Sequence, residues 1–244
     1  MNIIGLIPAR GGSKSIVKKN IKKMLGKPLI AWSIEAALAS KINRVIVTTD
    51  DPEIRRVAIK YGAEAPFLRP AKLATDKMAI EPVIRHTVDW LMKNENYQVD
   101  GVVLLMPPTP IKPIKHINKM IDLFKKKKFD SVVAVREMIA NDNPFWQLKR
   151  NDKTGKISLF NDKPLKKILP QRQLLPTSYS RNDVAYVFKP KNLLEKIPNL
   201  YGDKVELYLM DNFYNVDINT PDDWLFCEYK MKIYQKMKKN NRLP

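Results

Sequence analysis

The sequence of 244 residues predicts a single α/β domain whose central sheet is mainly parallel and is flanked by helices. Strand-like apolar runs alternate with helical patterns through the first half of the chain, as in repeated strand–helix units. Residues 101–106 are apolar without interruption, which is typical of a strand that a parallel sheet buries on both faces. Sheets of this kind bind ligands at the carboxyl ends of their strands. Functional residues are therefore expected at those ends.

The predicted elements follow from local patterns. Residues 28–40 carry apolar side chains at helical spacing. A helix over residues 51–61 begins at Asp51, a good N-cap, and has Pro52 in its first turn. Gly62 then stands where a helix commonly ends. In chain order, we predict strands at residues 2–8, 44–48, 101–106, 131–135, 183–188 and 204–209, and helices at residues 28–40, 51–61, 81–94, 115–126 and 222–238.

Residues 138–180 interrupt this alternation. The segment is polar, contains several prolines and Trp146, and shows the weak alternation of a β-hairpin around residues 152–155. We expect it to form an insertion outside the core sheet, within one domain that spans residues 1–244. An insertion this thin lacks a core of its own, so we predict that it packs against a second copy in a two-fold dimer. A loop region without such a partner is the alternative.

The chain is strongly basic, with 44 lysines and arginines against 25 aspartates and glutamates and a net charge of +19. A nucleic-acid partner is one interpretation of such a charge. The lysines are scattered, however, and the densest runs stand at the ends of predicted helices, where the helix dipole favours cations. A basic surface equally attracts anionic small-molecule substrates, and nucleic acid is the less favoured partner.

Cysteine and histidine content limits the kinds of metal site. Cys227 is the single cysteine and the chain has two histidines, which excludes an intrachain disulfide and leaves no basis for a Cys-rich zinc site. We expect Cys227 to be a packing residue in a helix. Any metal is then a hard cation held by carboxylates, water and substrate phosphates. Since no apolar run approaches the roughly 20 residues that cross a bilayer, we expect a cytoplasmic protein without a membrane partner.

The best candidate site is the loop after the first predicted strand. It contains Gly11, Gly12 and Ser13 together with Arg10 and several lysines. Glycines let backbone N–H groups approach a polyphosphate closely, and the cations neutralise its charge. The loop matches neither the P-loop nor the dinucleotide-binding pattern. From these residues alone, a phosphate site and a solvated basic turn are equally good interpretations.

A resemblance to a known family favours the phosphate site. The sequence Ile-Pro-Ala-Arg-Gly-Gly-Ser-Lys at residues 7–14 resembles the signature of the acylneuraminate cytidylyltransferases. The resemblance implies a Rossmann-like nucleotidyltransferase fold, with a mainly parallel sheet flanked by helices and a small dimerisation insertion. Further matches follow in the family's order over nearly the whole chain, at residues 19–21, 26–30, 47–51, 67–71, 73–76 and 215–224.

The resemblance also implies roles for the residues that match its motifs. Lys19 would face the α-phosphate of CTP, where charge builds as pyrophosphate leaves, and Arg10 and Asp217 would complete the catalytic group. Asp217 matches a carboxylate that binds Mg²⁺. Asn219 stands where family members commonly have a second aspartate; its neutral oxygen is still a metal ligand, and Asp211 is a further candidate. The implied nucleotide-binding set is Arg10, Gly11, Gly12, Ser13, Lys19, Asn20 and Arg69, of which Arg69 matches the arginine near the cytosine. A loop-packing arginine and a turn-stabilising aspartate are the alternatives for Arg69 and Asp217.

The acceptor that the resemblance implies is an α-keto acid sugar, whose carboxylate needs a guanidinium. Arg172 and Arg181 lie in segments that resemble those lining the family's sugar site, one of them reaching over from a partner subunit; a structural role for each arginine is the alternative. The pocket departs from the family where Met106 replaces an amide that commonly contacts the sugar. Lys112 replaces an arginine, which keeps the charge but loses the bidentate fork, and Asp183 replaces a glycine. The implied substrate-binding set is Lys112, Arg172, Arg181 and Asn182.

The sequence therefore predicts a Mg²⁺-dependent cytidylyltransferase that joins CMP from CTP to an acidic nine-carbon keto sugar and releases pyrophosphate. Sialic, legionaminic and pseudaminic acids are the candidate acceptors, and the altered pocket favours a relative over N-acetylneuraminate itself. A second interpretation keeps the chemistry with another nucleotide or with a deoxyoctulosonate sugar. A third is a non-catalytic, basic homologue that binds nucleic acid. Asn219, Met106 and Ile80 favour this third interpretation, and the intact loop at residues 10–20 opposes it.

Overall fold

The computed structural model describes residues 1–126 and 128–243 and has the predicted α/β architecture. The described residues form a central sheet of six strands, and each predicted strand is present in it. These strands are β1 (Ile3–Pro8), β4 (Arg44–Thr48), β5 (Gly101–Leu104), β6 (Ser131–Glu137), β9 (Tyr179–Phe188) and β10 (Val205–Leu209). Their order across the sheet is β10-β6-β9-β5-β1-β4.

The sheet is mainly parallel, as predicted, with one reversed strand. β1 runs parallel to β4 and to β5, and β10 runs parallel to β6. β9 is antiparallel to both of its neighbours, β5 and β6. The chain returns from the insertion at the edge where β5 and β6 end, so β9 has to run in the opposite direction. The sequence pattern predicts this strand but not its direction.

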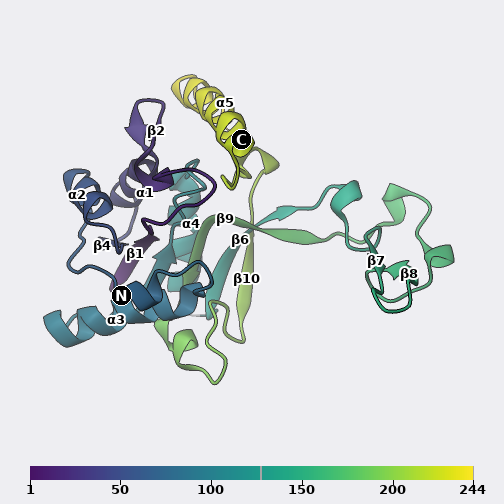
Figure 1. Ribbon diagram of the computed structural model, residues 1–244, viewed down its shortest axis with the longest axis horizontal. Coiled ribbons are helices and arrows are strands. Elements are labelled where there is room, and N and C mark those ends of the chain that lie inside the picture. Colours follow the sequence, from purple (N-terminus) through teal and green to yellow (C-terminus); the bar gives the residue numbers. More distant parts are fainter. Residues whose placement is uncertain (127, 244) are drawn as a thin grey trace.

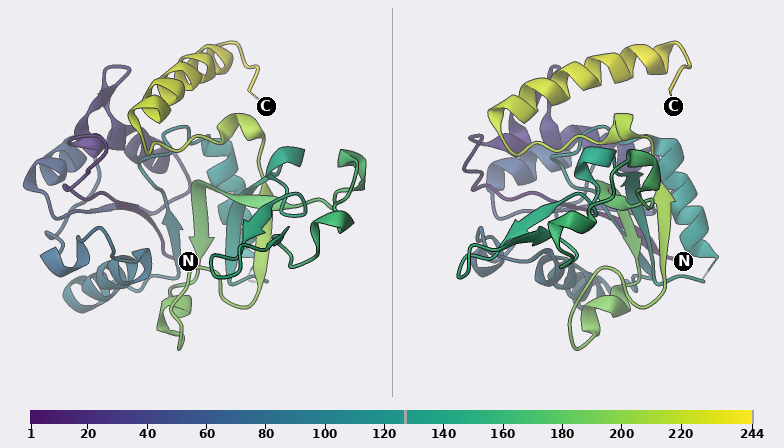
Figure 2. Two further views of the ribbon diagram at one scale, coloured as in Figure 1. Left: turned by 45° about the vertical axis from the view of Figure 1, so that its right-hand side comes forward. Right: turned by 90° about the vertical axis from the view of Figure 1, so that its right-hand side faces the viewer.

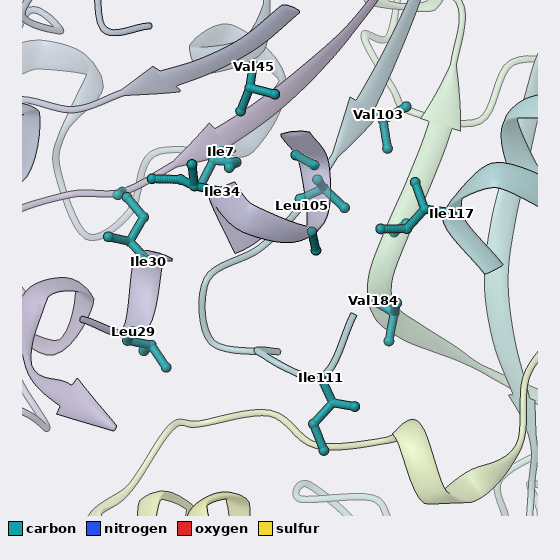
Figure 3. Close-up of a cluster of buried hydrophobic side chains, with 14 of the residues drawn as sticks. Ile7, Leu29, Ile30, Ile34, Val45, Val103, Leu105, Ile111, Ile117 and Val184 are labelled. Atoms are coloured by element: carbon teal, nitrogen blue, oxygen red, sulfur yellow. The ribbon is translucent and has the colours of Figure 1, made fainter. Parts of the chain in front are cut away.

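Helices cover both faces of the sheet (Figure 1). They are α1 (Leu29–Leu38), α2 (Pro52–Lys60), α3 (Ile80–Glu95), α4 (Ile114–Lys125) and α5 (Pro221–Lys239), and each predicted helix corresponds to one of them. Helices α1, α2, α4 and α5 contribute to the buried apolar cluster on one face, and α3 contributes to the cluster on the other. Figure 3 shows side chains of α1, α4 and strands β1, β5 and β9 gathered in the first cluster.

The expected helix boundaries have the predicted causes. The Asp51 carboxylate accepts hydrogen bonds from the backbone N–H groups of Glu53 and Ile54, at 2.7 and 3.1 Å, and so caps α2. Gly62 follows this helix with a φ of +91°, a conformation that favours glycine. Cys227 of α5 is 1% exposed within the core, which confirms its packing role. No helix in the described part of the chain combines the length and apolarity that a bilayer crossing requires.

The insertion projects from the sheet as an arm (Figure 1). Its stem continues β6 and β9, with Glu137 paired to Tyr179 and the Met138 N–H donating to the Ser178 carbonyl at 2.9 Å. Farther out, β7 (Leu148–Arg150) and β8 (Ile157–Leu159) pair in an antiparallel hairpin, which confirms the predicted one. A second short hairpin, β2 (Lys23–Met24) with β3 (Lys27–Pro28), precedes α1 and was not indicated by the sequence pattern.

The C-terminal helix marks the functional edge of the sheet. In both views of Figure 2, α5 crosses the molecule at the end opposite to the N-terminus. Because β1 starts near the N-terminus, its carboxyl end points to the same side as α5. The Lys19 ammonium, in the loop after β1, donates to the Ile218 carbonyl just before α5 at 2.8 Å. The loops after the parallel strands and the chain that leads into α5 therefore meet at this edge.

Candidate active site

A cavity of about 200 Å³ opens beyond the carboxyl ends of β1, β4 and β5. These ends lie together because the three strands are parallel. The structure thus brings most of the predicted nucleotide-binding residues into one concave site. The lining consists of Pro8, Arg10, Ser13, Lys14, Ser15, Lys19, Asn20, Arg69, Leu73, Ala74, Thr75, Ile80, Met106 and Pro108.

Hydrogen bonds to the end of β4 and to the Asn20 side chain hold the loop after β1 in place. The Ala9 N–H donates to the Thr48 carbonyl at 3.0 Å, which extends the pairing of β1 with β4 by one residue. The Asn20 side chain, 5% exposed, donates to the Arg10 carbonyl at 2.9 Å. Asn20 therefore fixes the shape of the loop and also contributes to the cavity wall. This contact uses only the backbone of Arg10, whose half-buried side chain is paired with the Asp76 carboxylate.

Gly11 and Gly12 shape the loop in different ways. The Gly11 N–H donates to Asp50 Oδ1 at 3.2 Å. A Cβ atom at Gly11 would lie 2.7 Å from Oδ2 and 2.9 Å from Cβ of Asp51, the N-cap of α2, so only glycine fits at this position. A Cβ atom at Gly12 would meet nothing within 4 Å. Of the two predicted glycines, Gly11 is thus required by a close approach of the loop to the start of α2.

Lys19 joins the loop to the segment before α5. Its ammonium is half-buried and donates to the Ile218 carbonyl. Partial burial lowers the pKa of Lys19, and the nearby Asp217 carboxylate partly offsets this effect. Arg10 acts on Lys19 in the same direction as burial, because two cations at short range repel. A strongly anionic group between Lys19 and Arg10 would relieve that repulsion.

Asp217 and Asn219 lie side by side before α5. The Asn219 amide donates to Asp217 Oδ2 at 2.7 Å. Partial burial raises the pKa of the Asp217 carboxyl, and the Asp183 carboxylate acts in the same direction. The turn itself is held by Asp223, whose carboxylate accepts from the N–H groups of Asn219 and Thr220 at 2.9 and 2.8 Å. Asp223 therefore stabilises the turn. Asp217 and Asn219 are not among the described residues that line the cavity, but Asp217 lies close enough to Lys19 to affect its pKa.

Asp217 and Asn219 fit a hard cation that takes most of its ligands from water and substrate phosphates. Among the described residues, no group of three or more His, Cys, Asp or Glu side chains is arranged to hold a metal. Mg²⁺ commonly keeps several waters and binds through one or two protein oxygens plus substrate phosphates. The Asp217 carboxylate and the Asn219 amide oxygen suit that pattern. Asp211, the further candidate, caps a short 3₁₀ turn by accepting from the Phe213 N–H at 2.7 Å.

Arg69 also lines the cavity. It is 6% exposed, and its Nη2 donates to Asp50 Oδ1 at 3.3 Å. Its Nε has no hydrogen-bond partner among the described residues. Since a guanidinium carries five N–H donors, Arg69 has donors left for a ligand in the cavity. These donors suit a group that presents acceptors, and the nucleotide-binding role of Arg69 stays a prediction beside the alternative of a loop-packing arginine.

Comparison with known proteins identifies the family. A family model described as Cytidylyltransferase matches residues 4–241. The chain belongs to the cytidylyltransferase family. This agrees with the resemblance that the loop at residues 7–14 indicates.

Relatives of this cytidylyltransferase match nearly its whole length. It is 32% identical over 240 residues to the CMP-N,N'-diacetyllegionaminic acid synthase of Legionella pneumophila, with 97% of this chain and 99% of the other covered. It is 30% identical over 234 residues to a pseudaminic acid cytidylyltransferase of Campylobacter jejuni, with coverages of 96% and 97%. A solved structure of CMP:2-keto-3-deoxy-manno-octonic acid synthetase complexed with CTP superposes with a TM-score of 0.69 at 15% identity, over 97% of this chain and 100% of the other. That likeness concerns the fold.

Two carboxylates of this cytidylyltransferase escaped the sequence-based prediction of site residues. Asp76 forms ion pairs with both Arg10 and Lys14, and Asp50 contacts Gly11 and Arg69. Both lie inside segments that carry the family resemblance, residues 73–76 and 47–51, which was the available signal. Asp76 neutralises two cations of the loop, so an incoming polyphosphate has to exchange with this carboxylate.

The structure does not bring the predicted sugar-binding residues together in the cavity, in contrast to most of the nucleotide-binding residues. Lys112 is 4% exposed, and its ammonium donates to Thr109 Oγ1 at 2.9 Å and to the Val184 carbonyl at 2.7 Å. Burial lowers its pKa to about 7. The structure thus uses Lys112 inside the protein and does not place it in the cavity lining. The sequence could not indicate the burial of Lys112, because a lysine in a proline-rich turn is expected to be exposed.

The other three predicted sugar-binding residues lie in the arm or in β9, where the arm joins the sheet. Asn182, 1% exposed at the start of β9, has an amide nitrogen without a hydrogen-bond partner among the described residues. Arg181 is exposed and donates to the Tyr201 hydroxyl at 2.6 Å. Arg172 lies in the arm, beside Asn143 and Pro176, and is not part of the cavity lining of its own chain. Met106 and Ile80, the apolar departures from the family, do line the cavity.

Proposed function

We propose that this protein transfers CMP from CTP to an acidic nine-carbon keto sugar and releases pyrophosphate in a Mg²⁺-dependent reaction. The observation that carries the proposal is a single cavity lined both by the buried guanidinium of Arg69 and by the cations Arg10 and Lys19. A nucleoside triphosphate needs both, because its base is neutral and rich in acceptors while its phosphates carry the charge. The names of the legionaminic and pseudaminic acid enzymes support the acceptor class.

In the proposed reaction, the anomeric hydroxyl of the sugar attacks the α-phosphorus of CTP. A new O–P bond forms, the bond to the pyrophosphate oxygen breaks, and the hydroxyl proton passes to water. Lys19 and Arg10 stabilise the charge that develops on the α-phosphate and on the leaving pyrophosphate. Asp217 and Asn219 would hold Mg²⁺, whose chemistry there is to neutralise phosphate charge and to acidify the attacking hydroxyl. Catalysis is then mainly positioning and charge stabilisation.

Within this proposal, the apolar wall favours a relative of N-acetylneuraminate, such as legionaminic or pseudaminic acid. Met106 and Ile80 line the cavity and offer no hydrogen-bonding groups to a sugar hydroxyl. A second candidate acceptor is a deoxyoctulosonate, because one solved structure of the same fold is a synthetase for that sugar. The proposed compartment is the cytoplasm, where CTP is available.

Pyrophosphate release tests the function directly. Purified protein is incubated with CTP, Mg²⁺ and each of a panel of nine-carbon keto acids and a deoxyoctulosonate, with Asp217→Ala as the control. We expect release with one nine-carbon acid and its loss in the variant. Release with the deoxyoctulosonate alone would establish the second candidate. Absence of both release and CTP binding, with salt-dependent affinity for DNA or RNA, would replace the enzyme by a nucleic-acid binder.

We also propose that two copies form a dimer through the arm. Beyond its stem, the arm exposes large apolar side chains, which are costly to leave in water when they form a patch. A second copy would cover them and would bring Arg172 of the arm toward a cavity other than its own. The exposed apolar residues are Ile139, Leu148, Ile157, Phe160, Leu165, Ile168 and Leu174.

Changing Leu148 and Phe160 to serine is expected to convert the dimer to a monomer, because both side chains lie on the exposed apolar face of the arm. Sedimentation velocity at micromolar concentration measures the change in mass. Leu225→Ser is the matched control, since Leu225 is 68% exposed on α5 and outside the arm. A monomeric wild-type protein would contradict the dimer and the shared sugar site together.

Replacing Gly11 by alanine is expected to weaken CTP binding about tenfold or more, the cost of losing one hydrogen bond to a charged group. The new Cβ would strike Asp51 and push the loop off Asp50. Isothermal titration with CTP measures the effect. Gly12→Ala is the control, because its Cβ would meet nothing within 4 Å. Equal effects of the two substitutions would show that the contact with Asp51 is unimportant.

A further inference from the structure

We infer that Asp50 is a positioning residue that couples the loop after β1 to Arg69 and, through Arg69, determines the preference for cytosine. It acts through Arg69 and Gly11 and has no assigned contact with substrate. The inference rests on the proposed function, since it takes the cavity to be a CTP site.

One carboxylate oxygen makes both connections. Asp50 is the second residue after β4, and its Oδ1 accepts from the Gly11 N–H at 3.2 Å and from Arg69 Nη2 at 3.3 Å. The backbone of Arg69 is tied to the same place, because its N–H donates to the Thr49 carbonyl at 2.7 Å. The loop after β1 and Arg69 are therefore both hydrogen-bonded to the residues that directly follow strand β4. If the loop moves Asp50, the hydrogen bond from Arg69 changes. If Arg69 moves Asp50, the hydrogen bond from Gly11 changes.

Arg69 depends on this carboxylate for a counter-charge as well as for its orientation. The side chain is 6% exposed, and a buried cation without a counter-charge is strongly destabilised. Burial lowers the pKa of Arg69, and Asp50 acts against that effect. With its Nε lacking a partner among the described residues, the guanidinium plane has Asp50 as its anchoring ion pair.

A fixed guanidinium distinguishes cytosine from uracil. Cytosine presents two adjacent acceptors, O2 and N3, whereas uracil carries a donor at N3. Arginine offers N–H donors and no acceptor, so it suits the cytosine edge and leaves the uracil N3–H without an acceptor. Sites built on such hydrogen bonds reject the wrong ligand because a polar group stays unpaired. The guanidinium of Arg69 distinguishes the two bases only while its N–H donors keep their direction. Asp50 sets that direction.

The test compares three ligands with wild type, Asp50→Asn and Asp51→Asn. Asp50→Asn keeps an oxygen near Gly11 but removes the charge that Arg69 requires. We expect it to weaken CTP binding about tenfold while changing UTP binding less, so that the ratio of the two affinities falls. Binding of inorganic tripolyphosphate, which has no base, should weaken as well. Asp51→Asn is the matched control because its carboxylate contacts α2 rather than Arg69.

A merely structural role would weaken CTP and UTP by the same factor in Asp50→Asn, and an unchanged ratio of affinities would overturn the inference. So would normal tripolyphosphate binding. If Asp50→Asn does not fold by circular dichroism, Arg69→Lys takes its place, since it keeps the charge and loses the fork. The same fall in ratio and in tripolyphosphate affinity is then expected, and its absence is fatal to the coupling. Wild type that binds CTP but releases no pyrophosphate would instead contradict the proposed function alone.

Discussion

Replacing Lys19 by alanine is expected to lower kcat for pyrophosphate release about 10²- to 10³-fold, the typical cost of removing one group that stabilises developing charge. Lys19 is half-buried between the loop after β1 and the Ile218 carbonyl, with Asp217 and Arg10 close by. An ammonium there opposes the charge that builds on the α-phosphate. Steady-state pyrophosphate release measures the loss, and CTP affinity measured by titration should fall much less than kcat.

Lys18→Ala is the control for this variant. Lys18 is exposed, forms an ion pair with Glu53 at 2.5 Å and does not line the cavity. Because burial lowers the pKa of Lys19 below the ordinary 10.5, the ammonium loses its proton at a lower pH than an exposed lysine. We therefore expect activity to decline on the alkaline side below pH 10.5, and Lys19→Arg to move that decline upward. An equal loss of kcat in Lys18→Ala would remove the special role of Lys19.

Replacing Asp217 by asparagine is expected to lower activity about a hundredfold at fixed Mg²⁺, since metal-assisted charge stabilisation is worth several kcal/mol. The variant keeps the shape of the side chain and the neighbouring Asn219 contact but removes the charge. Because partial burial raises the pKa of Asp217 above 3.8, wild-type activity should also fall as the pH drops through that raised value. Pyrophosphate release at increasing Mg²⁺ concentrations measures the first effect, and wild-type release across a series of pH values measures the second.

Two further variants separate the metal ligands. Asn219→Asp supplies a second carboxylate beside Asp217, so we expect half-maximal activity at a lower Mg²⁺ concentration. Asp211→Asn should leave the Mg²⁺ dependence unchanged, because the Asp211 carboxylate is engaged with the Phe213 N–H. If Asp211→Asn matched the effect of Asp217→Asn, the cation would be shared with Asp211. A normal Mg²⁺ response in Asp217→Asn would contradict the proposed metal role.

Local patterns determine much of this protein. Apolar runs and periodic patterns predict the strands of the central sheet and the five helices that cover it, because burial periodicity and end-capping residues such as Asp51 act within a few positions of the chain. The loop at residues 7–14 indicates the family for a similar reason, since the chemistry of phosphate binding needs glycines and cations at close spacing. The hairpin in the arm is likewise predicted by its turn residues.

Only the tertiary structure decides what depends on contacts between distant segments. The reversed direction of β9 follows from where the arm returns to the sheet, which no local pattern contains. Lys112 is withdrawn from the cavity because the Val184 carbonyl, 72 positions away, accepts from its ammonium. Asp50 links the loop after β1 to Arg69 because the Gly11 N–H and Arg69 Nη2 donate to the same oxygen. Spacing in sequence identifies which residues are chemically able to act, and packing determines which of them reach the cavity.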